Sequence, residues 1–126
     1  MKSFVTAMII FSVMILSGIA FDICLGNMSG QLMDGCKEIS DKIDGDNLQE
    51  AFADTKKLSE YIDGEKGLLS SILDHSSIDE IEKEISELLG YTEQNDKTEA
   101  AVSVKKLQHM FEHLPENYAL ALQNIL

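Results

Sequence analysis

An uncharged run of eighteen residues near the N-terminus constrains this chain more than any other feature. It extends from Phe4 to Phe21 and reads FVTAMIIFSVMILSGIAF. A helix needs about 20 apolar residues to cross a hydrocarbon core of roughly 30 Å, and apolar residues continue past Asp22. The sequence therefore predicts a transmembrane anchor within residues 1–26 that contacts membrane lipid through residues 4–25.

The charges around the run predict its orientation. Lys2 and the terminal amine precede it, whereas Asp22 and Asp34 follow it. Because basic residues stay on the cytoplasmic side of a membrane span, we expect a single-pass cell-membrane protein with a cytoplasmic N-terminus and an extracytoplasmic remainder.

A cleaved secretory signal is the alternative interpretation of the run. Gly18 and Ala20 offer small residues at the two positions that a signal peptidase reads. The uncleaved anchor is favoured because the apolar periodicity continues through this point. Both interpretations place the rest of the chain outside the cytoplasm.

The remainder is one acidic domain, predicted over residues 27–126. About 105 residues follow the run, which is enough for one small core and not for two. From Asp22 onwards the chain carries nine lysines and all 22 acidic residues, which gives it a formal charge of −13. Such a charge repels phosphate backbones, so nucleic acid is excluded as a partner.

The two cysteines do not indicate a disulfide framework. Cys24 and Cys36 lie on one predicted helix, about 18 Å apart along its axis at 1.5 Å per residue, which is too far for a bridge. They are expected to be buried or partly buried thiols, with an intermolecular disulfide as the alternative. Gly26 and Gly30, four residues apart, could let two anchored helices approach closely, so a homodimer is possible.

Apolar residues recur at a spacing of three and four throughout the chain, which is typical of helices. The sequence predicts an all-α protein, in which the transmembrane helix continues into a small antiparallel bundle of about four helices. The first helix is expected from near Ser3 to Lys42. The apolar side of this helix beyond the membrane is expected to consist of Leu25, Met28, Leu32, Cys36, Ile39 and Ile43.

Residues 44–47 (Asp-Gly-Asp-Asn) are expected to form a turn and to cap the next helix. A calcium loop is excluded because an EF-hand needs oxygen ligands at its fifth and twelfth positions and glycine at its sixth. Counted from Asp44, these positions are Leu48, Thr55 and Gln49.

The second helix begins at Leu48, and glycines at 64 and 67 predict a kink or break within it. Ser77, with Glu80 three residues later, fits a capping box, which makes Ser76 or Ser77 the expected N-cap of the following helix. That helix has an apolar stripe and a solvent-facing side. The stripe is Ile78, Ile81, Ile85, Leu88 and Thr92, and the solvent-facing side is Glu82, Lys83, Glu84 and Glu87.

A turn over residues 94–97 precedes another helix, and Pro115 ends that helix and opens a last short one. The inward-facing residues predicted for these two helices are Ala101, Val104, Leu107, Gln108, Phe111 and Leu114, followed by Tyr118, Leu122 and Ile125.

Three stretches together resemble one known family. They are the N-terminal MKSF with its apolar span, LLSSILDHSSIDEIE over residues 68–82, and FEHLPENYALALQNIL over residues 111–126. The chain resembles domain of unknown function 4363, a family of small bacterial envelope proteins found mainly in spore-forming Gram-positive bacteria. The resemblance covers nearly the whole chain.

The resemblance implies an N-anchored, extracytoplasmic helical domain with no assigned activity. Many members of this family carry tryptophans in the second helix, whereas this chain has none, which weakens the case for an aromatic binding surface. The positions that match the family pattern are Asp74, His75, Ser76, Ile78, Asp79, Glu112, His113, Pro115 and Glu116.

His109, Glu112 and His113 have the spacing of an inverted zinc-peptidase motif, in which two histidines on one helix face bind the metal. Such a site needs a third protein ligand, and Glu116 is the only acidic residue that follows. A metal-dependent hydrolase is therefore an alternative, while the ordinary interpretation is a pair of histidines at a helix end. No catalytic residue, metal ligand or cofactor is assigned.

Asp74, His75 and Ser76 are adjacent, so they cannot form a hydrolase triad, whose members converge from separate positions. They are interpreted as a corner between helices. Asp74 and Ser76 are expected to accept backbone N–H bonds, and His75 could reach Glu112 or Glu116. The residues predicted to form this corner or to contact a partner are Asp74, His75, Ser76, Asp79, Glu112, His113 and Glu116.

An anchor and two capped corners, without recognisable catalytic chemistry, favour a non-enzymatic module that binds another envelope protein. A metal-dependent hydrolase and an extracytoplasmic cation sensor that uses the acidic face are the alternatives.

Overall fold

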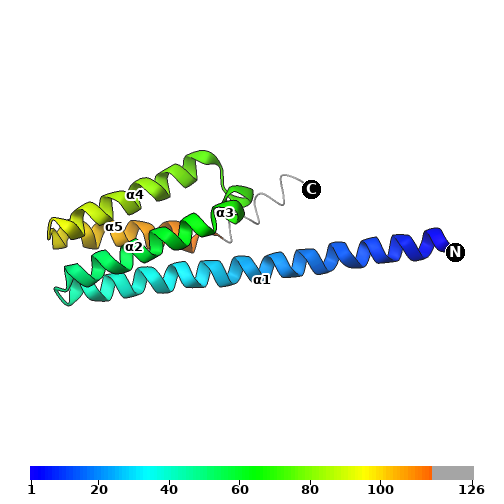
Figure 1. The fold of residues 1–126 in the computed structure, drawn as a ribbon, viewed down its shortest axis with the longest axis horizontal. Helices are drawn as coiled ribbons and strands as arrows, with labels where there is room; N and C mark the ends of the chain where they lie inside the picture. The colour runs from blue at the N-terminus through cyan, green and yellow to red at the C-terminus, as the bar shows by residue number, and fades with distance from the viewer. Residues whose placement is uncertain (115–126) are drawn as a thin grey trace.

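The computed structural model describes residues 1–114, and this part of the chain is helical, with no strand (Figure 1). The predictions of an all-α fold and of a bundle of about four helices are confirmed. The helices are α1 (Lys2–Asp44), α2 (Leu48–Gly64), α3 (Lys66–Ile72), α4 (His75–Glu93) and α5 (Lys97–Glu112).

The bundle consists of the second half of α1 with α2, α4 and α5. Helix α1 packs against α2 and α5, and α4 packs against the same two helices. Helices α2 and α5 run antiparallel to α1, and α4 runs parallel to it (Figure 1). As a result, α3, the start of α4 and the end of α5 lie at the end of the bundle from which α1 projects, called the arm end below.

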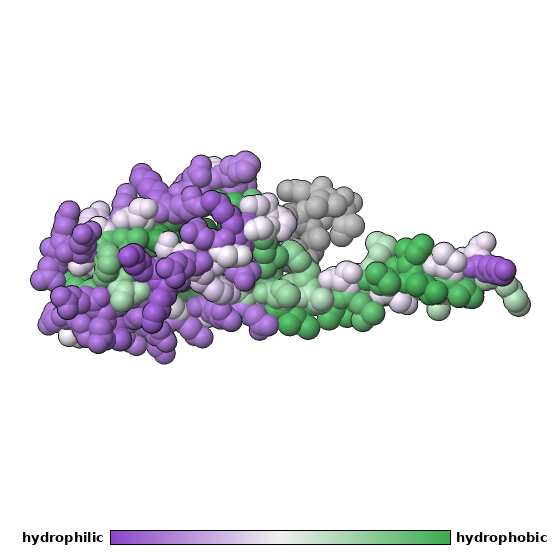
Figure 2. Space-filling view, in the orientation of Figure 1, coloured by the Kyte–Doolittle hydropathy of each residue, from purple (hydrophilic) through white to green (hydrophobic). Residues whose placement is uncertain are grey.

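Helix α1 has two different halves. Residues 2–20, called the arm below, are all exposed and extend away from the bundle over about 29 Å at 1.5 Å per residue. Figure 2 shows that the arm surface is largely hydrophobic, whereas the bundle surface is mostly hydrophilic. The buried stripe of the second half is the predicted one: Leu25, Met28, Leu32, Cys36, Ile39 and Ile43.

By length and composition, α1 is the one helix within residues 1–114 that could cross a membrane. Its most apolar stretch is not buried against any other part of the structure. The chain therefore has one candidate membrane-spanning helix near its N-terminus.

The core lies between the four bundle helices. From α5 it receives Val104, Leu107 and Phe111, each at most 1% exposed, as the apolar stripe predicts. Ala101 and Gln108 were expected to face inward, but they are only half-buried. Their expected places in the core are taken by Ala100 and Ser103, which are at most 1% exposed.

Short polar segments end the helices at both ends of the bundle. In the first turn Asp46 has a φ of 60° and the Oδ1 of Asn47 accepts the N–H of Glu50, so the predicted turn and cap are confirmed. Lys97 Nζ lies 2.7 Å from Asp46 Oδ1 and links the start of α5 to this turn. The predicted break after Gly64 separates α2 from α3.

The prediction that Glu84 faces solvent is wrong. Glu84 is 8% exposed, and its Oε1 accepts a hydrogen bond of 2.7 Å from the hydroxyl of Ser103 on α5. Helix α4 packs against two neighbours, α2 and α5, so it buries a wider face than one apolar stripe indicates. The small Ser103 side chain leaves room for the carboxylate and satisfies one of its oxygens.

The last predicted helix, with Tyr118, Leu122 and Ile125, lies outside the described residues. Both cysteines are free thiols within the described residues. Cys36 is buried as predicted, but the prediction that Cys24 is buried or partly buried is wrong, because Cys24 precedes Leu25, where α1 first becomes buried, and is exposed. Burial raises the pKa of the Cys36 thiol to about 12.

Replacing Phe111 with alanine should destabilise the bundle strongly. The side chain is fully buried in the core, and such a truncation typically costs about 3–5 kcal/mol. Val102 on the same helix is 46% exposed, so Val102→Ala should change the free energy of unfolding by less than about 0.5 kcal/mol. Denaturant titration of the full chain in detergent, followed by circular dichroism, measures both. Equal effects of the two variants would contradict the described core.

In a Cys24→Ala variant, the remaining thiol of Cys36 should resist a maleimide at pH 8. The thiolate is the nucleophile, and burial both shields this thiol and raises its pKa to about 12. Full labelling is expected in denaturant. In the matched Cys36→Ala variant, the exposed Cys24 should react without denaturant. Rapid labelling of Cys36 in the folded chain would show that α1 does not pack as described.

Candidate functional site

The start of α4 and the end of α5 meet at the arm end and enclose a pocket of about 150 Å³. The two segments of the family resemblance, near residue 75 and near residue 113, thus lie at one place in the fold. The residues that line this corner pocket are Leu73, Ser77, Glu80, Ile81, Met110, His113 and Leu114.

Asp74 fixes the first turn of α4. Its backbone is extended, with φ −75° and ψ 166°, and its Oδ1 accepts the N–H of Ser77 at 2.9 Å. Asp74 is therefore the N-cap, and the expectation of a cap at Ser76 or Ser77 is wrong. Aspartate and serine are both good caps, and here the extended backbone at residue 74 decides between them.

The charged form of Asp74 is stabilised by this geometry. Hydrogen bonds from the side chain and the backbone of Ser77 lower the pKa of the Asp74 carboxyl. The expected bond from a backbone N–H to Asp74 is confirmed. The equivalent bond to Ser76 is absent within residues 1–114, where Ser76 is exposed.

Histidines lie on both sides of the corner but do not meet across it. His75 is exposed and makes no hydrogen bond to Glu112 in the described part of the chain. Glu116, the other expected partner, lies outside it. His113 follows the last turn of α5, and its ring centroid lies 4.5 Å from that of His109 in an edge-to-face arrangement.

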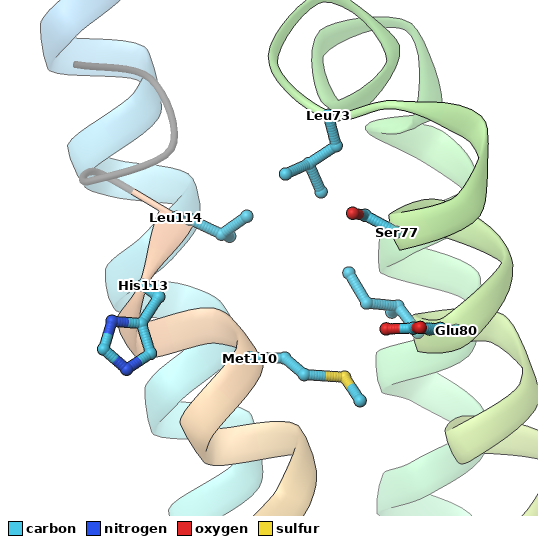
Figure 3. Close-up of a pocket in the computed structure, with 7 residues that line it drawn as sticks. Leu73, Ser77, Glu80, Met110, His113 and Leu114 are labelled. Carbon is cyan, nitrogen blue, oxygen red and sulfur yellow. The ribbon is translucent and has the colours of Figure 1, made fainter. Parts of the chain in front are cut away.

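Figure 3 shows how the pocket residues are directed. The side chains of Met110 and Leu114 point towards Leu73 and the first turns of α4, whereas the imidazole of His113 turns away from them. Leu73, Ile81, Met110 and Leu114 give the pocket apolar wall atoms, and Ser77, Glu80 and His113 are its polar lining residues.

The predicted zinc-peptidase set is incomplete in the described chain. His109 and His113 are neighbours, but within residues 1–114 no three histidine, cysteine or acidic side chains come together in a way that could hold a metal ion. Glu112 is exposed next to them. The structure therefore brings together two of the three residues and supplies no further ligand there.

Of the residues predicted for this corner, His113 lines the pocket within residues 1–114, whereas Ser77 and Glu80 were predicted only as a capping box. Ile81 and Leu114 were assigned to the core, and Met110 was not singled out. In the sequence, Met110 lies four residues before Leu114, which is the spacing of one helix side, although α5 itself ends at Glu112. That spacing was the available signal for the pocket.

Comparison with known proteins identifies the family. A family model described as Domain of unknown function (DUF4363) matches residues 23–125. The chain belongs to the DUF4363 family. Neither the curated proteins nor the solved structures compared with it contain a match.

The DUF4363 match begins close to the point where α1 enters the bundle. Residue 23 precedes Leu25, the first fully buried residue of the helix. The match therefore includes the bundle and the corner pocket and omits the whole arm. It assigns no activity to either.

Replacing Asp74 with alanine should lower the melting temperature by about 4 °C at neutral pH, because α4 loses its cap. The pKa of Asp74 is lowered in the folded chain, so its contribution is complete above the ordinary aspartate pKa of about 3.9 and is lost as the pH falls below it. The difference between wild type and variant should therefore shrink at pH 3.

Thermal unfolding at pH 7, 5 and 3 measures this effect. Asp79→Ala is the matched control, because Asp79 lies one turn later, is exposed and caps nothing. A difference between wild type and Asp74→Ala that is the same at pH 3 and pH 7 would rule out the charged cap.

Proposed function

We propose that this DUF4363 protein is a membrane-anchored, non-enzymatic interaction module of the cell envelope. The arm lies in the membrane, the acidic bundle lies outside the cytoplasm, and the corner between α4 and α5 binds another envelope protein. The observation that carries the proposal is the continuity of α1, which joins an exposed apolar arm directly to one side of the bundle core.

The exposed surface of the arm supports the membrane placement. Its large apolar side chains would be costly to leave in water, since burial stabilises by roughly 25 cal/mol per Å² of apolar surface. No other helix of the described chain covers them. The most exposed of these side chains include Phe4, Phe11, Met14 and Leu16, each at least 63% exposed.

The position of the corner limits the kind of partner. The corner lies at the arm end of the bundle (Figure 1), so an arm placed in the membrane would turn the corner towards the bilayer. A protein that binds there must itself reach the membrane surface. The partner is therefore another membrane protein or one held close to the bilayer.

The charges of the corner limit the chemistry of the partner. Glu80 lines the pocket together with apolar side chains, and Asp74, Asp79 and Glu112 are exposed on the same turns of the chain. We expect a partner surface with basic residues around one apolar side chain, which enters the pocket beside Met110. Paired apolar anchors within a polar rim are typical of protein interfaces.

Photo-crosslinking in intact cells tests this proposal. A photoreactive residue at position 79 and one at position 112 should capture the same membrane-associated protein, because both positions flank the corner. The control position is 95, in the turn at the opposite end of the bundle, where Asn95 is exposed. A photoreactive residue there should not give this adduct.

The orientation of the chain relative to the membrane is measured in the same cells with a tag after Leu126. Protease added outside the cells should remove the tag. Adducts that are absent, or that are identical at positions 79, 112 and 95, would contradict a partner site at the corner. A tag cleaved only after lysis would contradict the placement outside the cytoplasm.

A further inference from the structure

A second hollow lies where the arm joins the bundle, away from the corner pocket. It is a groove of about 610 Å³ between α1 and the α2–α3 junction. Helix α1 contributes a stripe that begins at Ser17 and ends at Gln31, and the opposite wall consists of Tyr61, Glu65 and Leu68. None of these residues lines the corner pocket.

The position of the groove relative to the bilayer follows from the length of the arm. Residues 2–20 span about 29 Å, which is close to the roughly 30 Å of a hydrocarbon core. With the arm in the membrane, Ser17 and Ala20 lie near the outer edge of the hydrocarbon, and Asn27 and Gln31 lie roughly 10 Å and 16 Å further along α1, on the headgroup side. The apolar surface continues from the arm to the adjoining end of the bundle (Figure 2).

The lining becomes more polar along this direction, although Ser17 lies at its arm end and Met28 lies between the two amides. Ala20 and Phe21 of α1 line the groove on the arm side, and Leu68 lies on the opposite wall. Further along α1 the lining contains the amides of Asn27 and Gln31. An occupant that fits this gradient has an apolar tail towards the arm and a polar head towards the bundle.

The charged residue in the groove determines which polar head group the groove can bind. Glu65 is the one charged residue among the described residues that line it. The neighbouring Lys66 is directed elsewhere, because its Nζ lies 2.8 Å from Glu82 Oε1 on α4. Partial burial and, second to it, the negative charge of Glu65 on the same wall raise the pKa of Tyr61.

We propose that this groove binds one phospholipid with a primary ammonium head, with an acyl chain along Phe21 and Leu68 and the ammonium at Glu65. The side-chain amides of Asn27 and Gln31 donate hydrogen bonds to its phosphate, which finds no cation in the groove. A purely anionic headgroup has no partner for Glu65 and is repelled by it. The inference rests on the proposed placement of the arm in the membrane.

Native mass spectrometry of the full chain in detergent tests this site. Phosphatidylethanolamine and phosphatidylglycerol with identical acyl chains are the two probes. We expect one phosphatidylethanolamine per chain and roughly tenfold weaker binding of phosphatidylglycerol, as a charge-assisted hydrogen bond implies. Glu65→Gln should remove this preference for the ammonium head.

Two tryptophan variants at nearly the same depth provide the matched control. Ala20→Trp fills the groove and should abolish the lipid adduct. Ile19→Trp should retain it, because Ile19 is 52% exposed and does not line the groove. Equal binding of both lipids, or an adduct that survives in Ala20→Trp, would overturn the proposal.

Deletion of residues 115–126 identifies the competing occupant. An adduct that forms only after this deletion would show that the chain's own C-terminal segment fills the groove, and would overturn the lipid site. Photo-crosslinking at positions 79 and 112 reports on a protein at the corner and does not depend on groove residues. Failure of the lipid site and failure of the proposed partner site are therefore distinguishable.

Discussion

The packing of one side of α1 against α2 and α5 is the interaction on which the rest of the structure depends. From Leu25 onwards this helix buries a residue every three or four positions, and before Phe21 it buries none. A continuous helix without proline is stiff over this length, so the direction of the arm and the position of the bundle are coupled. The arm end is therefore a fixed face of the molecule, and the corner pocket and the groove both lie there.

These two hollows differ in chemistry although they share one end of the bundle. The corner pocket is small and is lined by Glu80 and apolar side chains, which agrees with the proposed apolar anchor from a protein partner. The groove is larger and leads from the apolar arm to Glu65, which suits an amphiphile. Because they use different helices, one protein could hold a lipid and a partner simultaneously at the same membrane surface.

Much of the fold could be predicted because helices follow local periodicity. The apolar stripes of α1 and α4, the turn before Leu48 and the break after Gly64 all come from residues within a few positions of each other. The predictions from sequence were wrong where contacts between residues distant in the chain determine burial. Glu84 looks solvent-facing in the sequence, yet the hydroxyl of Ser103, nineteen positions later, satisfies it inside the bundle. Asp74 is the N-cap of α4 because the backbone is extended at this residue, between α3 and α4.

The sequence by itself determined the helical class, the uncharged arm, the acidic character of the bundle and the resemblance to the DUF4363 family, since all of these depend on residue types and short spacings. Only the tertiary structure decided that α1 and α4 both pack between α2 and α5, that the residues near 75 and 113 meet at the arm end, and that Tyr61 and Glu65 face the base of the arm. The physical reason is that periodicity specifies which side of a helix is apolar, whereas the fit of side chains between helices specifies which helix covers that side.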